Sequence, residues 1–448
     1  MQVTDPIEKV VTRFAPSPTG LLHGGNYRTA VFAYLFAKKS GGEFIVRIED
    51  TDKQRSKKEY EDNIWETIEW LGLMPDRTFR QSEHAVRHTQ LLKMLIAENK
   101  AYVSKEEIKK EGDRSEVIRF RNPNKSVTFV DLIRGAITFD TTDLGDFVIA
   151  RSLEEPVFHF AVVVDDVDAG VSHIVRGEDH ISNTPRQILI QEALGFTTPV
   201  YAHLPLVLDA SRAKLSKRRG AKALTEYKAE GYLPEAVINY LALLGWHPEG
   251  EQEIFSVWEL IEAFSLERIQ KSAGIFDETK LKWFNHEHMK LLTAQDFAYR
   301  LKEYLALRGA TPPAYLEEIL PLLRERAQTF GEAYEALAAG EYEFLVQEPS
   351  INAELLLKCA KADKEGVRTH LIKVQQMLVG MPEGNFTADT VKETIFPYAT
   401  EAGRASVLWP LRVALSGQEK SPDPFTLCGL LGKEKTLSRI KTALAVLE

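Results

Sequence analysis

Two short segments, far apart in the chain, carry side chains suited to phosphate chemistry. The first is the Gly/Pro-rich turn Ala15–Gly20 with its continuation His23–Asn26, where glycines allow close approach of the backbone to a ligand. A helix that starts there directs its amide groups at the ligand, and His23 can donate to a phosphate oxygen as charge develops. The second is the loop Lys214–Gly220, whose two lysines suit a leaving pyrophosphate because an ammonium can follow a moving phosphate.

Each segment alone has a plainer interpretation. A turn rich in glycine and proline is also a tight connection, a lone histidine is more often structural, and a basic loop is usually a solvated surface turn. The presence of both segments in one chain favours the chemical interpretation.

The elements predicted around the first segment form a strand–helix–strand unit. Val10–Phe14 and Phe44–Ile48 are predicted strands, and a helix from about Gly25 to Lys39 joins them before Gly41-Gly42 ends it. This pattern is typical of a parallel sheet with a right-handed crossover, in which ligands bind at the carboxyl ends of the strands. A helix over Lys57–Leu71 is expected next.

Between Ser82 and Glu155 the pattern changes to that of an α+β insert. We expect a helix over His88–Glu98 and short strands at Val117–Arg121, Val127–Val130, Ala136–Thr138 and Phe147–Ala150. The parallel pattern is then predicted to resume with strands Val157–Val164 and His173–Val175, helix Pro185–Leu194 and strand Val200–Leu208.

After Leu224 helical patterns dominate. The predicted helices are Pro234–Leu244, Val257–Phe264, Glu278–Phe284, Ala314–Ala327, Glu354–Ala360, Val367–Leu378 and Lys433–Leu447. Boundaries are expected near Gly309–Pro313 and Gly380–Asn385, where proline and glycine interrupt the pattern.

Composition limits the class of protein. The chain has 448 residues, of which 44% are hydrophobic and 27% charged, as in an ordinary globular protein of about three domains. The net charge of −9 argues against a nonspecific nucleic-acid coat, although local basic clusters such as Lys53–Lys58 could contact phosphates. We expect no secretory signal and no membrane span. Cys359 and Cys428 can form no disulfide framework or zinc quartet, and we expect buried thiols in the cytoplasm.

The wider phrases around the two segments resemble bacterial-type glutamyl-tRNA synthetases, which are class I aminoacyl-tRNA synthetases. His23–Asn26 and Lys214–Arg218 look like their HIGH and KMSKS signatures. The phrases are RFAPSPTG running into HGGN, FIVRIEDTD, VVVDDVDAGVSHIVRGEDH and KLSKRRG, in that order. The resemblance covers residues 10–290 well. Beyond them it rests on length, helicity and the closing LCGLLGKEKTLSRIKTAL.

This resemblance implies a doubly wound parallel-sheet (Rossmann-like) α/β catalytic core, split by an α+β insert that grips the acceptor end of tRNA, and all-α C-terminal domains that bind the anticodon. The domains expected are the first half of the core (1–81), the insert (82–187), the second half with the lysine loop (188–223), a helical stem-contact domain (224–312) and two helical anticodon-binding domains (313–379 and 380–448).

The resemblance also implies which residues hold glutamate: Arg13, Ala15, Ser17, Glu49, Phe158 and Arg176. Arginine is suited to a substrate carboxylate and Glu49 to the ammonium group. For three of them a purely structural role is also open. Arg13 could be a surface residue at a strand end, Glu49 could join Asp50 and Asp52 in capping the next helix, and Arg176 could pair with Glu178 or Asp179.

The residues implied for ATP are His23, Gly25, Asn26, Glu178, Asp179, Lys214, Ser216 and Lys217, with His23, Lys214 and Lys217 as the catalytic set. Glutamate would attack the α-phosphorus of ATP, and the adenylate would then acylate the terminal adenosine of tRNA. Such catalysis is positioning and charge stabilisation, with Mg²⁺ carried by the nucleotide.

Three departures from the family pattern stand out. His23-Gly-Gly-Asn26 replaces a tetrad that is commonly His-Val-Gly-Gly, which puts the role of Asn26 in doubt. Phe158 replaces the usual tyrosine, and a lost hydroxyl contact would cost about 0.5–1.5 kcal/mol; His159 is a candidate for replacing it, or a core histidine. Ala101–Lys105 lacks the cysteines that begin a zinc site in some relatives, so no structural zinc is expected.

The expected partners are L-glutamate, ATP and glutamate tRNA, with a monomeric protein in the cytoplasm and no membrane. Whether glutamine tRNA is also charged stays open. A glutamine-specific enzyme is opposed by Arg13, since an amide needs no arginine. A truncated tRNA-modifying relative is opposed by residues 310–448, and a catalytically silent tRNA-binding paralogue by His23 and the lysine loop.

Overall fold

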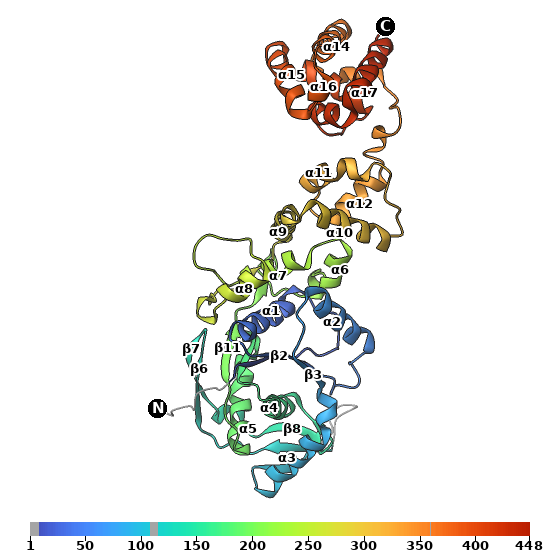
Figure 1. Ribbon diagram of the computed structural model, residues 1–448. Coiled ribbons are helices and arrows are strands. Elements are labelled where there is room, and N and C mark those ends of the chain that lie inside the picture. The colour runs from blue at the N-terminus through green and yellow to red at the C-terminus, as the bar shows by residue number, and fades with distance from the viewer. Residues whose placement is uncertain (1–8, 108–114, 359) are drawn as a thin grey trace. The chain divides into compact units, whose positions relative to one another are not determined.

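The computed structural model describes residues 9–107, 115–358 and 360–448, and these residues form two compact units (Figure 1). The first unit ends at Leu291 and the second begins at Leu292. The helix predicted over Glu354–Ala360, and the expected burial of Cys359, fall partly on a position outside the described residues.

A parallel sheet forms the centre of the first unit. Strands β1 (Val11–Phe14), β2 (Glu43–Ile48) and β3 (Arg77–Arg80) pair in parallel, and so do β10 (His173–Gly177) and β11 (Val200–Leu204). The two groups meet at Ser172, whose amide donates to Val11 O at 3.0 Å while its hydroxyl accepts from Val11 N at 2.8 Å. The predicted strand–helix–strand unit is confirmed.

Helices cover both faces of this sheet, as the doubly wound prediction requires. On one face, α1 (Gly24–Lys39) and α7 (Pro234–Leu243) pack on alternate strand residues such as Phe44 and Val46. On the other face, α4 (Phe158–Asp168) and α5 (Thr184–Leu194) pack around Ile45 and Ile174. Since strand side chains alternate between faces, Arg13, Arg47 and Arg176 all lie on the α4 side.

Part of the predicted insert, residues 82–187, belongs to the core sheet. Strands β4 (Ala101–Lys105), β5 (Glu116–Phe120), β8 (Phe147–Ser152) and β9 (Glu155–Pro156) form a separate antiparallel sheet. The hairpin β6 (Ser126–Asp131) and β7 (Gly135–Asp140) instead extends the core sheet, where Asp131 pairs with Tyr201 of β11. Strand β10 lies within the expected insert range but belongs to the parallel sheet.

One predicted strand is wrong. Val157–Val164 lies at the start of helix α4, in which every residue from Phe160 to Asp166 is buried. A short apolar run that is buried on all sides has no periodicity to separate a helix from a strand. The predicted strand Val200–Leu208 is two strands, because β12 (Val207–Leu208) leaves β11 after Pro205 and pairs with β13 (Gly274–Ile275).

The remaining elements are helical. In the first unit they are α2 (Lys58–Leu71), α3 (Ala85–Ala97), α6 (Leu224–Ala229), α8 (Val257–Ala263) and α9 (Glu278–Leu291). In the second they are α10 (Ala294–Leu307), α11 (Leu316–Arg326), α12 (Phe330–Ala338), α13 (Ala353–Lys358), α14 (Lys364–Val379), α15 (Ala388–Ala402), α16 (Arg404–Ser416) and α17 (Pro424–Val446).

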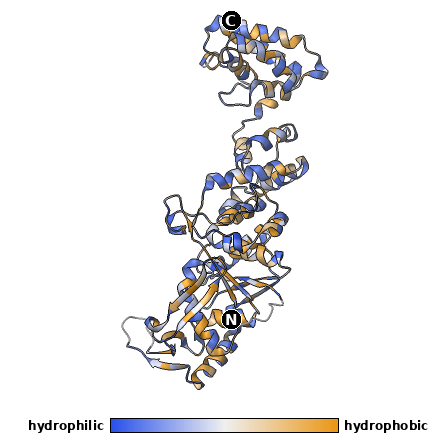
Figure 2. Ribbon diagram, turned by 90° about the vertical axis from the view of Figure 1, so that its left-hand side faces the viewer, coloured by the Kyte–Doolittle hydropathy of each residue, from blue (hydrophilic) through white to orange (hydrophobic). Residues whose placement is uncertain are grey.

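The helices of the second unit carry apolar and polar residues side by side along their length, as amphipathic helices do (Figure 2). Cys428 in α17 is a buried free thiol, and burial raises its pKa to about 12. Over the described ranges, no helix is long and apolar enough to cross a membrane.

Candidate active site

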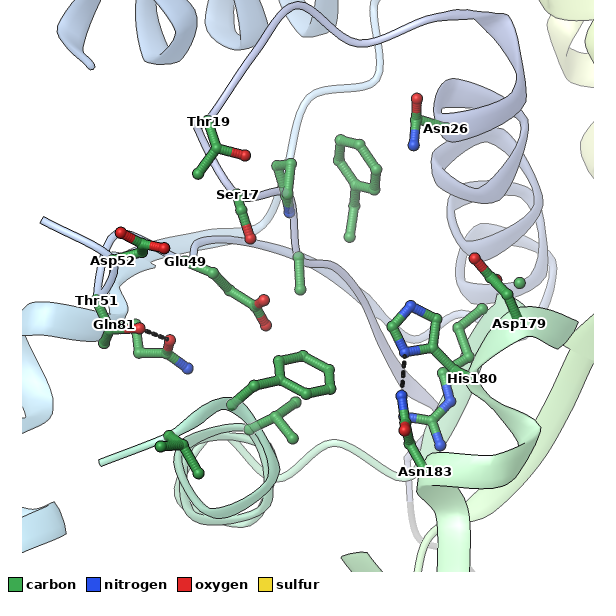
Figure 3. A pocket seen from close by; sticks show the side chains of 18 of the residues that line it. Ser17, Thr19, Asn26, Glu49, Thr51, Asp52, Gln81, Asp179, His180 and Asn183 are labelled. Atoms are coloured by element: carbon green, nitrogen blue, oxygen red, sulfur yellow. Dashed lines mark hydrogen bonds between the residues drawn. The ribbon is translucent and has the colours of Figure 1, made fainter. Parts of the chain in front are cut away.

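A cavity of about 1430 Å³ opens at the carboxyl ends of β1, β2 and β10. Most of the residues predicted from the sequence line it: Arg13, Ala15, Ser17, His23, Gly25, Asn26, Glu49, Phe158, Arg176, Asp179 and Lys214. Figure 3 shows Ser17, Glu49, Asn26 and Asp179 around the open space. Three predicted ATP residues, Glu178, Ser216 and Lys217, are not among the lining residues.

At one end of the cavity a buried network of charges holds Arg13 and Glu49. Arg13 Nε lies 3.2 Å from Asp166 Oδ1, and Arg47 bridges the same carboxylate to Glu49 Oε1, which is 3.0 Å from its Nη2. Arg47 is fully buried and Arg13 is 5% exposed, so Arg13 is not a surface residue at a strand end. Arg13 also lines the cavity, and a guanidinium has further N–H donors besides the Nε–H that it gives to Asp166.

The two carboxyl groups of this network respond differently to burial. Burial alone would raise the pKa of Asp166, but Arg13 and Arg47 together hold that pKa below its ordinary value. Burial raises the pKa of Glu49, and Arg47 offsets the effect only in part. Asp166 is therefore the fixed counter-charge of the network, while Glu49 gains from a further cation such as a substrate ammonium.

Arg176 is held without a carboxylate. Its guanidinium donates from Nε to His203 Nε2 at 3.1 Å, from Nη1 to Gln187 Oε1 at 2.7 Å and from Nη2 to Thr184 Oγ1 at 2.7 Å. Neither Glu178 nor Asp179 bonds to it among the described contacts, so the expected structural pairing is absent there. Burial lowers the pKa of Arg176 to about 10, which marks a buried cation that an anionic ligand would stabilise.

The opposite end of the cavity is built on the start of α1. His23 is the N-cap: its Nδ1 accepts from Gly25 N at 3.1 Å, and Asn26 Oδ1 accepts from His23 N at 3.1 Å. Asn26 thus completes a capping box at the backbone of His23, while Gly25 N holds the ring, which gives this departure from the family tetrad a structural role. Since Nδ1 is the acceptor, Nε2 carries the proton and can donate to a ligand.

Charge and packing near His23 also follow from its neighbours. Burial, reinforced by Lys214 and Lys217, lowers the pKa of His23 to about 4, so the ring is neutral near pH 7. Gly24 is required for packing, because a Cβ there would lie 2.8 Å from the Phe276 ring.

The lysine loop carries cations that are exposed and paired at the surface. Lys214 Nζ lies 2.7 Å from Asp179 Oδ2, and Lys217 Nζ lies 3.1 Å from Glu226 Oε1. The Lys214 side chain is 56% exposed and that of Lys217 is 31% exposed. Ser216 precedes the short 3₁₀ turn that begins at Lys217.

Glu178 is one of the predicted ATP residues that the structure does not bring to the cavity lining. Its Oε1 accepts from Leu206 N at 2.8 Å, and its Oε2 pairs with Arg134. Both oxygens are therefore engaged, and Glu178 fixes the cavity-lining segment around Leu206 instead of facing the cavity.

Asp52 does not take the capping role that the sequence left open for it, and His159 does not reach the cavity. Asp52 caps no helix, because it accepts from Arg55 while Lys57 is the N-cap of α2. Phe158 lines the cavity, whereas His159 does not, and its Nδ1 is buried with no partner among the described residues. His159 therefore does not replace the tyrosine hydroxyl that Phe158 lacks.

Sequence reasoning named neither Arg47 nor Asp166, and it missed His180. Arg47 stands within an apolar strand, and Asp166 ends the apolar run of α4; charges in such positions are a signal for a buried network. His180 projects into the cavity beside Asn183, whose amide bonds to its Nδ1 at 3.2 Å (Figure 3). Burial and the nearby Arg176 lower the pKa of His180 to about 4.

The two ends suit different parts of a ligand. Buried arginines next to one carboxylate fit a molecule with carboxylate groups and an ammonium. A capped helix start with a neutral histidine and a lysine loop fits a polyphosphate.

The catalytic family model for class I tRNA synthetases that act on glutamate and glutamine matches residues 9–112 and 104–283, and an anticodon-binding family model matches residues 296–444. The fold and the family match are those of class I tRNA synthetases.

Known relatives narrow this class further. The chain is 40% identical to a glutamate–tRNA ligase of Oleidesulfovibrio alaskensis, over 98% of this chain and 100% of the relative, and 40% identical to that of Aquifex aeolicus, over 97% and 98%. A crystal structure of a glutamate tRNA ligase from Elizabethkingia meningosepticum, in complex with its amino acid, matches 98% of this chain and all of its own with a TM-score of 0.83 at 31% identity. The chain belongs to the glutamate–tRNA ligase family.

Proposed function

We propose that this protein activates L-glutamate with ATP and transfers it to glutamate tRNA. The observation that carries the proposal is the pair Arg13 and Arg176, buried at one end of the cavity, where the hydrogen-bond partners of Arg176 among the described residues are neutral acceptors. A site for an uncharged amide would gain nothing from a second buried cation, because an unpaired buried charge costs several kcal/mol.

In the first step the substrate carboxylates bind Arg13 and Arg176, and the ammonium binds Glu49. An oxygen of the α-carboxylate attacks the α-phosphorus of ATP, the bond to the bridging oxygen breaks, and pyrophosphate leaves. His23 Nε2–H and the lysines Lys214 and Lys217 stabilise the charge on the phosphates. For this the lysines exchange Asp179 and Glu226 for phosphate oxygens.

In the second step the 2′-hydroxyl of the terminal adenosine attacks the carbonyl carbon of glutamyl-adenylate. An ester forms, AMP leaves, and the hydroxyl proton passes to solvent or to the departing phosphate. The chain contributes orientation of the two reacting groups, which is worth several kcal/mol of the barrier.

Mg²⁺ is proposed to enter with ATP as part of the substrate. Within residues 9–107, 115–358 and 360–448, no group of three His, Cys, Asp or Glu side chains could hold a metal ion. Phosphate oxygens and water are the ligands that Mg²⁺ prefers in such sites.

The proposed roles of the other regions follow the family. The insert (82–187) grips the acceptor end, residues 224–312 contact the stem, and 313–379 with 380–448 bind the anticodon. The match of an anticodon-binding model to residues 296–444 supports the last of these roles. We propose a cytoplasmic monomer. Charging of glutamine tRNA with glutamate is a second candidate, since the same amino-acid site would serve both.

ATP–pyrophosphate exchange tests the proposal. Exchange that depends on glutamate, measured with and without tRNA, is the expected result, with glutamine giving no exchange. Absence of glutamate-dependent exchange under both conditions would refute the proposal and favour a silent tRNA-binding protein. Charging assays on glutamate tRNA and glutamine tRNA then distinguish the two candidates.

A further inference from the structure

Arg176 depends on His203 for one of its three fixed hydrogen bonds. The two residues are opposite each other in the parallel pair β10–β11, and Arg176 Nε donates to His203 Nε2 at 3.1 Å. An arginine can only donate, so this bond exists only when Nε2 has no hydrogen. The orientation of Arg176 therefore depends on which nitrogen of His203 is protonated.

Asp131 determines which nitrogen of His203 carries the hydrogen. It is the last residue of β6, is 1% exposed, and its Oδ2 lies 2.7 Å from His203 Nδ1 and accepts from His203 N at 2.9 Å. A carboxylate in this place keeps the hydrogen on Nδ1 and leaves Nε2 as the acceptor that Arg176 needs.

The carboxylate has no other task at the cavity. Its second oxygen accepts from Ile133 N at 2.9 Å and from Arg134 N at 2.8 Å, within the turn between β6 and β7. Asp131 does not line the cavity. Burial alone would raise its pKa, but the bonds from His203 and from the turn keep the pKa lowered, so the group is ionised.

We propose that Asp131 is a positioning residue for glutamate: through the tautomer of His203 it fixes the guanidinium of Arg176 toward the substrate carboxylate. The inference rests on the proposed function of Arg176. It gives the β6–β7 hairpin, which extends the core sheet from the insert, an indirect part in amino-acid binding. Without the carboxylate, a hydrogen on Nε2 would oppose Arg176 Nε–H and turn the guanidinium away.

Asp131→Asn tests this, with Asp146→Asn as the matched control. Asp146 is also a carboxylate of the insert. It accepts hydrogen bonds from the backbone amide of Asn122 at 2.8 Å and from the hydroxyl of Tyr102 at 3.0 Å. Neither partner belongs to the hydrogen bonds that join His203 to Arg176. In ATP–pyrophosphate exchange, Asp131→Asn should raise the KM for glutamate about tenfold while the KM for ATP changes less than about twofold. Asp146→Asn should leave both constants within about twofold of the original protein.

Two results would overturn the proposal: an unchanged glutamate KM in Asp131→Asn, or an equal rise in the KM values for glutamate and ATP. Failure of the proposed function is distinguishable, because the unaltered protein itself would then show no glutamate-dependent exchange. If Asp131→Asn does not fold, ¹⁵N spectra of the histidine-labelled protein, with His203→Gln to assign the signal, decide the matter. Hydrogen on Nδ1 supports the proposal, and hydrogen on Nε2 refutes it.

Discussion

The two ends of the cavity hold their positive charges in opposite ways. At the amino-acid end, Arg13, Arg47 and Arg176 are at most 5% exposed and are fixed by Asp166 or by neutral acceptors. At the ATP end, Lys214, which lines the cavity, and Lys217, which lies on the same loop outside the lining, pair with carboxylates that are themselves about half exposed. Buried pairs are costly to break, whereas surface pairs contribute about 0–1 kcal/mol.

This difference matches the chemistry proposed for each end. A small rigid ligand with carboxylates is best recognised by cations that are already in place, because little ordering remains to be done on binding. A leaving pyrophosphate moves during the reaction, so cations with weak surface partners can exchange them and follow it. We therefore expect the amino-acid end to be preformed and the ATP end to rearrange.

The largest effect should come from Asp166→Asn. Removal of the shared counter-charge leaves Arg13 buried without its carboxylate partner and leaves Arg47 with Glu49 alone, so the unfolding free energy of the first unit should fall by about 3–5 kcal/mol. Calorimetric unfolding measures this. Asp179→Asn, which removes the partner of Lys214, should cost less than about 1 kcal/mol. Equal losses in the two variants would remove the contrast between buried and exposed pairs.

Asp166→Asn should also change how the stability of the protein depends on pH. Arg13 and Arg47 act against burial to hold the pKa of Asp166 below its unfolded value, so its contribution to stability is complete above about pH 4 and is lost as pH falls through the lowered pKa. Asp166→Asn should lack this loss in unfolding midpoints measured at decreasing pH. Burial raises the pKa of Glu49 instead of lowering it. Glu49→Gln should therefore still lose stability as the pH falls.

Arg176→Met should lower kcat/KM for glutamate in pyrophosphate exchange by about 100- to 1000-fold, since a buried charge-assisted contact to substrate is removed. The KM for ATP should change little. The exposed Lys228, paired with Glu66 at 2.8 Å, provides a control in Lys228→Met, which should leave both constants unchanged. A rise in the KM for ATP as large as the loss in kcat/KM for glutamate would show that Arg176 is not specific to the amino-acid end of the cavity.

Lys217→Ala and Lys214→Ala should each lower the rate constant of adenylate formation by about 100-fold, because charge stabilisation of the leaving pyrophosphate is lost. Since both lysines are partly exposed, the unfolding midpoint and tRNA binding should stay nearly unchanged. Rapid-quench measurement of adenylate formation tests this. Unchanged activation in both variants would exclude the loop from the reaction.

The smallest effect concerns His23. Burial, together with Lys214 and Lys217, lowers its pKa to about 4, so the exchange rate should show no step from His23 between pH 6 and pH 8. Its lowered pKa means that its contribution to stability is present above about pH 6.5 and is lost as pH falls toward 4. In NMR titrations, Lys214→Ala should raise the pKa of His23, and an unchanged pKa would place the lysine farther away than the structure does.

Much of the site could be predicted from the sequence, because its residues stand at strand ends. Arg13 lies near the end of β1, Glu49 follows β2 and Arg176 lies near the end of β10, and the carboxyl ends of parallel strands meet at one edge. His23 and Asn26 were expected at the start of α1, but their capping box depends on side-chain geometry that a motif does not show.

The failures have a common physical origin. The apolar run in α4 is buried on all sides, so it carries no helical period, and the strand predicted there is wrong. Glu178 stands in the right phrase, yet Leu206 N and Arg134, both distant in the chain, turn it away from the cavity. The hydrogen bond between Asp131 and His203 likewise joins distant residues, and no local pattern predicts such a contact.

A crystal structure of this protein with glutamate and a non-hydrolysable ATP analogue tests the contrast between the two ends most directly. We predict that the guanidinium groups of Arg13 and Arg176 keep their places to within about 0.5 Å and contact the glutamate carboxylates, while Lys214 leaves Asp179 for the phosphates. Displacement of Arg176 with Lys214 still bound to Asp179 would contradict the account.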